Sequence, residues 1–149
     1  MTRDFCELPL HNASDEEIAK ILREAKTVAV VGLSDNPEKD SYQVAAYLKA
    51  AGFRVIPVNP NVREVLGEKA YPSLAAIPPE VSIDVVDIFR RPEFIPAIVD
   101  EAIARGAKAV WMQRGLAHSA AADKARAAGL AVVMDRCMMV EHRRLSAGR

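Results

Sequence analysis

The sequence is poor in cysteine, glycine and aromatic residues, and it has no excess charge of either sign. Its 149 residues include two cysteines, seven glycines and 5% aromatic residues, and 20 basic residues balance 20 acidic ones. Two distant cysteines supply neither a disulfide framework nor the spacing of a zinc site. The charge balance argues against a whole-molecule field that would attract nucleic acid or an anionic membrane. Any anion-binding site must therefore be local.

Long hydrophobic runs are also missing. No segment reaches the length that spans a bilayer, and residues 1–5 do not begin a signal peptide. We therefore expect a reduced, cytoplasmic protein without a nucleic-acid or membrane partner. One domain is expected at residues 14–141, with tails at residues 1–13 and 142–149.

The chain does contain a regular alternation of strand-like and helix-like segments. Apolar strands are predicted at residues 28–32, 53–58, 83–88, 108–112 and 131–134. Helices are predicted at residues 14–26, 42–51 and 119–128, and one more from residue 92. One helical turn is expected at residues 62–66 and an irregular connection at residues 70–77. Strands that are apolar throughout indicate a parallel sheet covered on both faces.

The predicted fold class is therefore α/β, a doubly wound, five-stranded, parallel Rossmann-like sheet with an extra N-terminal helix. Counting strands along the chain, we expect the order 3-2-1-4-5. Ligands of such sheets bind beyond the carboxyl ends of the strands, near the reversal of strand order, expected here between strands one and four. This rule selects residues 32–39, 59–63, 89–92 and 113–116 as the candidate site.

The first of these segments has the features of a phosphate-binding turn. An apolar strand runs into Gly32 and a small polar loop, and a helix follows. Leu33, Ser34 and Asp35 could offer backbone N–H donors, Ser34 adds a hydroxyl, and Lys39 adds a positive charge. The alternative is that Gly32 merely turns the strand into the helix, because the loop matches neither Gly-x-Gly-x-x-Gly nor the Walker motif.

The second strand ends without the acid that a dinucleotide dehydrogenase places there for the ribose hydroxyls. Asn59 and Pro60 occupy that position, which argues against NAD. Arg63 follows closely enough to pair with a ribose phosphate, which coenzyme A carries at its 3′ position and NAD does not. NADP, through its 2′-phosphate, and a solvated arginine remain alternatives for Arg63.

Two consecutive arginines end the third strand. Arg90 and Arg91 follow Phe89 and precede a proline that suits a first helical turn. Contact with a pyrophosphate or adenine is expected for at least one of them. A surface pair, or an ion pair with Glu93, is the alternative.

The last two strands contribute three further candidates. Gln113 and Gly115 follow the fourth strand, where Gly115 suggests close backbone approach. Cys137 follows the fifth strand and could approach the thiol end of a pantetheine arm, even as a mixed disulfide. The alternative for Cys137 is a small buried hydrophobic residue.

With these segments in place, the chain resembles the coenzyme-A-binding domain family. This Rossmann-like domain stands alone in small bacterial and archaeal proteins, and it begins succinyl-CoA synthetase α subunits and ADP-forming acyl-CoA synthetases. The likeness extends over residues 14–141 and is carried by residues 28–34, 42–44, 55–60, 66–74 and 84–88, with Gly115 and Cys137. It implies that Leu33, Ser34, Asp35 and Asn36 contact the phosphates of coenzyme A, that Asn59, Pro60 and Arg63 flank its adenosine, and that residues 89–91 follow the nucleotide.

The expected function is binding of coenzyme A or an acyl-CoA by a stand-alone binding, carrier or regulatory module. No catalytic or metal-binding residue is predicted, because no nucleophile is paired with a base and the three histidines lie in different contexts. The sequence also lacks the phosphohistidine domain of the synthetases. The alternatives are an NADP- or nucleotide-dependent enzyme and a subunit that needs a ligase-like partner. A homo-oligomer is also compatible with the sequence.

Overall fold

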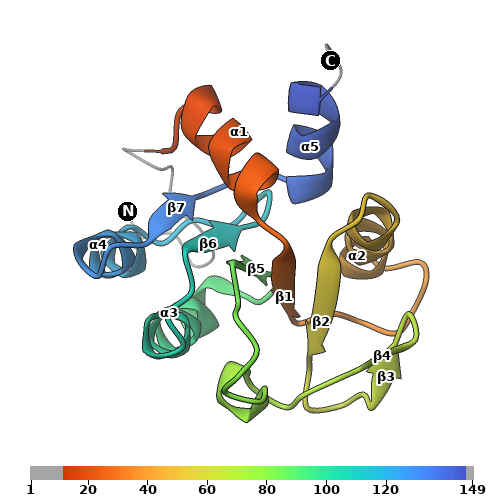
Figure 1. The fold of residues 1–149 in the computed structure, drawn as a ribbon. Helices are drawn as coiled ribbons and strands as arrows, with labels where there is room; N and C mark the ends of the chain where they lie inside the picture. Colours follow the sequence, from red (N-terminus) through yellow and green to blue (C-terminus); the bar gives the residue numbers. More distant parts are fainter. Residues whose placement is uncertain (1–11, 147–149) are drawn as a thin grey trace.

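Five apolar segments form one parallel sheet in the computed structural model, which describes residues 12–146 (Figure 1). The strands are β1 (Thr27–Val31), β2 (Arg54–Val58), β5 (Val85–Ile88), β6 (Ala109–Met112) and β7 (Ala131–Val133). Nearly every strand residue is buried. Valine and isoleucine dominate these strands, and their branched side chains suit a sheet that is covered on both faces.

The strand order is β2-β1-β5-β6-β7, so the doubly wound, five-stranded class is confirmed with one correction. The third predicted strand, β5, lies beside β1 and not at the edge beyond β2. That edge position holds a single parallel bridge between Val58 and Tyr71. The order therefore reverses between β1 and β5, and not between β1 and β6.

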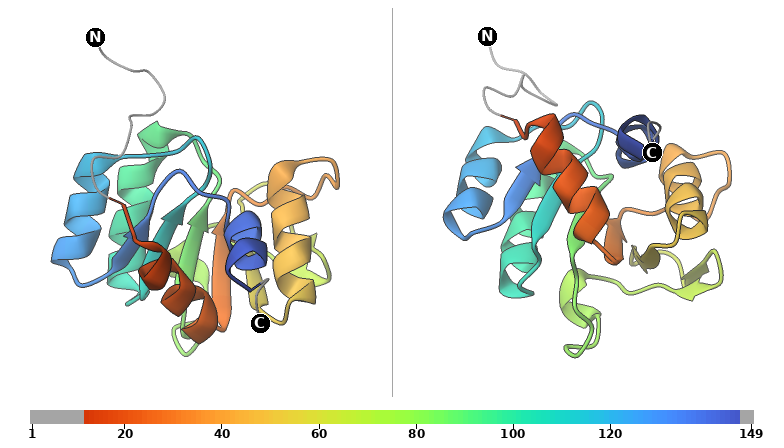
Figure 2. Two further views of the ribbon diagram at one scale, coloured as in Figure 1. Left: turned by 90° about the horizontal axis from the view of Figure 1, so that it is seen from above. Right: turned by 45° about the horizontal axis from the view of Figure 1, so that its top comes forward.

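Helices cover both faces of the sheet (Figures 1 and 2). One face packs against α1 (Asp15–Glu24), α2 (Asp40–Ala50) and α5 (Met138–Ser146). The other face packs against α3 (Ile95–Ala104), α4 (Ser119–Ala127) and the short 3₁₀ helix η1 (Leu74–Ala76), and a second one, η2 (Pro92–Phe94), leads into α3. The sheet thus separates two hydrophobic cores.

Local capping interactions set the ends of the helices. Ser14 and Glu17 form the reciprocal capping box that begins α1, which confirms the extra N-terminal helix. His118 caps α4 by accepting the N–H of Ala121 at its Nδ1. Glycine follows α2, α3 and α4 with φ between +69° and +105°, the left-handed conformation in which glycine commonly ends a helix.

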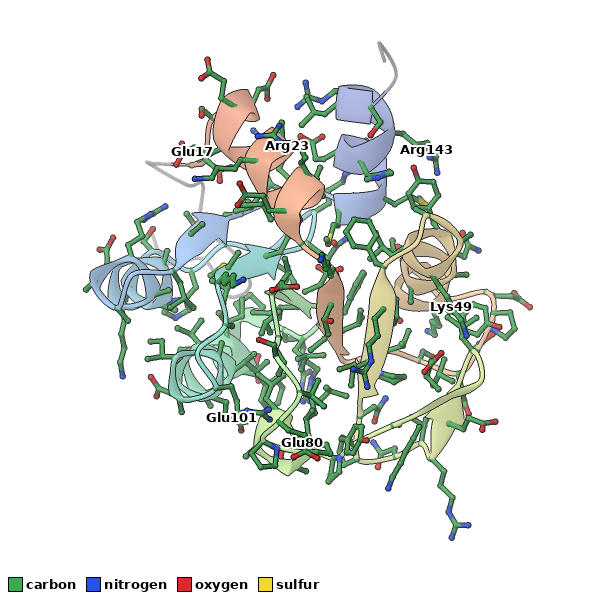
Figure 3. All side chains as sticks on the ribbon, viewed as in Figure 1. Glu17, Arg23, Lys49, Glu80, Glu101 and Arg143 are labelled. Carbon is green, nitrogen blue, oxygen red and sulfur yellow. The ribbon has the colours of Figure 1, made fainter. Side chains whose placement is uncertain are left out.

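A small hairpin replaces the helical turn expected at residues 62–66. Strands β3 (Glu64–Val65) and β4 (Glu68–Lys69) are antiparallel and joined by Leu66 and Gly67, which both have positive φ. Two such residues form the tight turn that matches the twist of a hairpin. Lys49, labelled in Figure 3, donates from Nζ to the Leu66 carbonyl and lies 3.0 Å from a Glu68 carboxylate oxygen.

Helix α5 begins one residue after Cys137 and includes residues 142–146, which the sequence assigns to a tail. Its His142 ring lies edge-on to Tyr47 and Phe53, and its Nδ1 is 2.8 Å from the Tyr47 hydroxyl. Arg144 pairs with Asp15 of α1 and with Glu141. These contacts hold α5 against α1 and α2. Cys6, His11 and most of the predicted N-terminal tail lie outside the described residues.

Candidate functional site

The loops that follow β1 and β5 touch at the reversal of strand order. Gly32 has φ +89°, and a Cβ added there would lie 2.5 Å from the Phe89 carbonyl oxygen and 2.9 Å from the Cδ of Arg90. Any other residue would clash with backbone, so glycine is required for both conformation and space. Two predicted segments, residues 32–39 and 89–92, therefore form one continuous surface at the carboxyl edge of the sheet.

The turn after Gly32 is shaped by its own side chains. The Ser34 hydroxyl accepts the N–H of Asn36 at 3.0 Å, and the Asn36 Oδ1 accepts the N–H of Glu38 at 3.0 Å. The Ser34 N–H, expected to be a free donor, is instead bonded to the Ser41 hydroxyl at 3.1 Å. Ser34 and Asn36 thus hold the turn in place through short local bonds.

Backbone donors nevertheless remain at this turn. Within residues 12–146 no acceptor takes the N–H groups of Leu33 and Asp35, while the Leu33 side chain is fully buried in the core. Helix α2 begins at Asp40, and Lys39 is its N-cap residue. The Lys39 side chain makes no capping hydrogen bond, so it does not occupy the N–H groups of the first helical turn. Lys39 itself is exposed. The turn can therefore offer amide donors and a flexible cation to an anion.

The residues after β2 lie beside this turn and away from the cavity described below. Asn59 uses its whole carboxamide locally: Nδ2 donates to the Leu33 carbonyl at 3.0 Å, and Oδ1 accepts the N–H of Asn61 at 2.9 Å. Pro60 and Arg63 are exposed. Asn59 thereby ties the end of β2 to the turn after β1, and Arg63 places an exposed positive charge at the same edge.

A cavity of about 490 Å³ opens next to the contact between Gly32 and Arg90. This volume lies within the range of small-molecule sites. Six predicted site residues line it: Phe89, Arg90, Arg91, Gln113, Gly115 and Cys137. The sequence did not assign to the site four residues of α2 and of the first turn of α5, namely Asp40, Gln43, Val44 and Val140. The apolar members of this set carried no sign that separated them from ordinary core residues.

The two arginines at the end of β5 differ in their surroundings. The Arg90 guanidinium lies 4.1 Å from the centroid of the Phe94 ring, a cation–π contact that fixes its position. Arg91 is more exposed, and its Nη2 lies 3.8 Å from a Glu93 carboxylate oxygen. The ion pair with Glu93 considered above therefore forms with Arg91, whereas Arg90 pairs with no carboxylate of residues 12–146 and lines the cavity.

The opposite wall joins the end of β6 to the start of α5. The Gln113 side chain is buried, and its Oε1 accepts the N–H of Met138 at 3.1 Å. Gly115 has φ +87° and donates its N–H to Asp135 Oδ1 at 2.7 Å. Cys137 is buried, and its carbonyl accepts the N–H of Glu141, which places it at the N-terminus of α5.

Sequence reasoning also missed Asp87, which lies in the centre of β5. It pairs in register with Val30 and Trp111, its side chain is fully buried, and neither carboxylate oxygen has a hydrogen-bond partner within the described residues. Burial raises the pKa of this carboxyl well above its usual value. Because side chains alternate along a strand, Asp87 shares a face of the sheet with Phe89. An acid inside an otherwise apolar strand was the available sequence signal.

Among residues 12–146, no three histidine, cysteine or acidic side chains gather as they would around a metal ion. Over the same residues, every helix is too short or too polar to cross a membrane.

The fold and cavity define a doubly wound α/β domain with a ligand-sized site at the carboxyl edge of its sheet. The sequence pattern of the CoA binding domain matches residues 26–143, and the chain belongs to this family. The uncharacterized protein YneT of Bacillus subtilis is 41% identical over 133 residues, which cover 89% of this chain and 97% of YneT. A solved structure of a hypothetical protein from Pyrococcus horikoshii OT3 has a TM-score of 0.87 at 45% identity, covering 94% of this chain and 97% of that one.

A larger enzyme shares part of the chain. The ADP-forming acetate–CoA ligase II of Archaeoglobus fulgidus is 34% identical over 85 residues. The match covers 56% of this chain and only 12% of the ligase. The similarity is thus confined to a small part of that enzyme.

Proposed function

We propose that this protein binds coenzyme A or an acyl-CoA at the carboxyl edge of its sheet, as a stand-alone binding, carrier or regulatory module. The observation that carries the proposal is the contact between Gly32 and residues 89–90 at the reversal of strand order, beside a 490 Å³ cavity. This is the position at which doubly wound domains bind nucleotides. Membership in the CoA binding domain family selects coenzyme A among nucleotides.

The parts of coenzyme A can be assigned to parts of the site. The pyrophosphate would lie on the free N–H groups of Leu33 and Asp35, with Arg90 beside it. The adenosine and its 3′-phosphate would lie toward Asn59, Pro60 and Arg63 at the end of β2. The pantetheine arm would then enter the cavity between β6 and α5. An acid at the end of β2 would repel the 3′-phosphate, and Asn59 carries no charge.

Calorimetry with coenzyme A, dephospho-coenzyme A, NAD and NADP tests the proposal. We expect the tightest binding for coenzyme A. Equal affinity for NAD would contradict the proposal, and tighter binding of NADP would favour a nicotinamide-dependent enzyme. If Arg63 binds the 3′-phosphate, Arg63→Ala should weaken coenzyme A binding about tenfold and leave dephospho-coenzyme A unaffected. A loss that is equal for both ligands would remove this role from Arg63.

The arginines of the cavity need a separate comparison. Arg90→Gln should weaken binding of both coenzyme A and dephospho-coenzyme A about tenfold or more, because both ligands carry the pyrophosphate. Arg91→Gln should have a smaller effect, because Glu93 already offsets its charge. Arg23→Gln, on an exposed part of α1, serves as the control for a lost surface charge. Unchanged affinity in Arg90→Gln would show that this arginine is a surface cation.

The similarity to part of a ligase suggests that an enzymatic partner, if this domain has one, would be a separate ligase-like chain. Co-purification of the tagged protein from its native host, followed by mass spectrometry, would recover a ligase-like chain if this domain acts as one subunit of a larger enzyme. Repeated recovery of the protein without such a chain favours the stand-alone module.

A further inference from the structure

One wall of the cavity carries a thiol beside an amide group that has a free donor. Cys137 and Gln113 both line the cavity and are only 9% and 5% exposed. The backbone N–H of Met138 donates to Gln113, and only an oxygen can accept that bond, so Oε1 faces Met138. The Nε2 group is then the free end, and it has no partner within residues 12–146. Among residues 12–146 the only buried side-chain polar atoms without a partner belong to Asp87, so Nε2 is open to the cavity and can donate to a ligand carbonyl there.

The chemistry of a pantetheine arm matches this wall. The cavity is continuous with Phe89 and Arg90, which contact the Gly32 turn. A coenzyme A molecule whose pyrophosphate lies on that turn therefore directs its pantetheine arm into the cavity. The arm carries amide carbonyls, which can accept from Gln113 Nε2, and it ends in sulfur, which can meet Cys137.

We propose that Cys137 forms a mixed disulfide with coenzyme A by thiol–disulfide exchange with a coenzyme A disulfide, and this proposal rests on the proposed function. The Cys137 thiolate attacks the sulfur of the coenzyme A half that lies in the cavity. A bond forms between the two sulfurs and the original S–S bond breaks. The other coenzyme A leaves as a thiolate, which takes up the proton that Cys137 released. The incoming disulfide is the oxidant, so no further acceptor of electrons is needed.

Positive groups line the cavity in which the exchange would take place. Cys137 lies at the N-terminus of α5, a nine-residue helix, where the helix dipole is positive. Arg90 and Arg91 line the same cavity. Glu141, the acid in the first turn of α5, is bonded to Arg144 at 2.7 Å, which offsets its charge. The consequence is a site that retains coenzyme A covalently until a thiol reductant releases it.

The test uses the full chain with Cys6→Ser, in which Cys137 is the only thiol. The protein is incubated with coenzyme A disulfide or glutathione disulfide, and the adduct is followed by intact mass. We expect the coenzyme A adduct to form at least about tenfold faster than the glutathione adduct, because binding positions the reacting sulfurs. Desulfo-coenzyme A, which lacks the thiol, should slow the reaction by competition, and dithiothreitol should release the adduct.

Two variants separate positioning from a general effect on structure. Cys137→Ser should abolish the adduct. Gln113→Leu should slow exchange with coenzyme A disulfide several-fold and leave exchange with glutathione disulfide unchanged, which a general loosening of α5 would not do. An equal effect of Gln113→Leu on both disulfides would overturn the role of its amide.

Calorimetry with desulfo-coenzyme A on Cys137→Ser distinguishes failure of the exchange proposal from failure of the proposed coenzyme A binding. If it binds but Cys137 reacts equally with both disulfides, or with neither, the exchange proposal is overturned and the proposed function stands. If desulfo-coenzyme A does not bind, the proposed function fails, and the exchange proposal fails with it.

Discussion

At the scale of single residues, Asp87 stands out because its carboxyl group is buried without a hydrogen-bond partner among residues 12–146. It lies in the central strand between Val30 and Trp111, and its side chain is fully buried. The protonated form is therefore favoured in the folded protein. The uncompensated carboxyl group of Asp87 therefore reduces the stability of the folded protein once it ionises.

This position predicts a pH-dependent difference in stability. Burial raises the pKa of Asp87 in the folded state. The neutral carboxyl group therefore contributes fully to the free energy of unfolding below about pH 3.9, the pKa of Asp in an unfolded chain, and this contribution is lost as the pH rises toward the folded-state pKa. Asp87→Asn removes this loss. We expect the variant to gain stability relative to the parent as the pH rises above about 4, as measured by urea unfolding. Parallel pH profiles for the two proteins would refute the assignment.

At the scale of elements, the site depends on loops that are held by contacts between distant segments. Arg105, after α3, donates to the carbonyls of Leu74, Ile77, Pro78 and Val81 at distances from 2.5 to 3.1 Å. Glu101, labelled with Glu80 in Figure 3, accepts the N–H of Leu74 at 3.0 Å. These bonds fix the connection that carries the chain from the β2 edge to β5, on the opposite side of β1.

Replacing Arg105 should therefore loosen this connection. Arg105→Lys retains the charge but cannot serve four carbonyls, and we expect a loss of about 2–3 kcal/mol in the free energy of unfolding. Arg105→Ala should lose at least as much. Denaturant unfolding measures both, with Arg23→Ala as the exposed control. A loss below about 0.5 kcal/mol in Arg105→Lys, as for a surface substitution, would contradict this role.

The Gly32 turn is the second element whose geometry can be tested. Gly32→Ala places a methyl group against the Phe89 carbonyl in addition to the strain of positive φ. We expect a loss of stability of about 2 kcal/mol or more and a loss of coenzyme A affinity of about tenfold or more. Gly129→Ala is the matched control, because it also has positive φ but has no atom within 4 Å of the added Cβ.

Thermal unfolding measures the stability of the two glycine variants, and calorimetry measures their affinity for coenzyme A. The control should lose only about 1–2 kcal/mol and retain its affinity. If both variants behave alike, the contact between the two loops does not limit the conformation of the site.

At the scale of the whole molecule, α5 both covers one hydrophobic core and forms one wall of the cavity. Met138 is fully buried against the sheet, and the helix contacts α1 and α2. The indole N–H of Trp111, the single tryptophan of the chain, donates to the Arg136 carbonyl at 2.9 Å just before this helix. A change in α5 should therefore affect both the stability of the fold and the wall of the cavity.

A chain that ends at Arg136 should lose its cooperative fold, because it exposes the core around Val30 and Trp111. We expect Trp111 fluorescence to shift to longer wavelength and the near-ultraviolet circular dichroism to weaken. Arg143→Ala, which removes only an exposed cation beside Tyr47, should unfold cooperatively with a loss of at most about 1 kcal/mol. Cooperative unfolding of the shortened chain with the parent's Trp111 signal would contradict this prediction.

Much of the fold could be predicted because its signals are local. Short segments of the sequence are enough to specify the capping box at Ser14, the glycine after each of three helices and the apolar strands. Each of these features is present in the structure. Helix α5 was missed because its apolar residues gain meaning only from the partners that they meet. The hairpin at residues 64–69 was missed because Leu66, an unusual residue for positive φ, stands in its turn.

By itself, the sequence determined the parallel α/β class, the helix ends and the loops that could carry a ligand, because hydrophobic period and capping act over a few residues. Only the tertiary structure decided which strand lies beside β1, since strand neighbours are set by packing across the whole sheet. That choice brings Arg90 to Gly32 and places Cys137 and Gln113 on one wall of the cavity. The site exists because these segments, distant in the chain, end at one edge of the sheet.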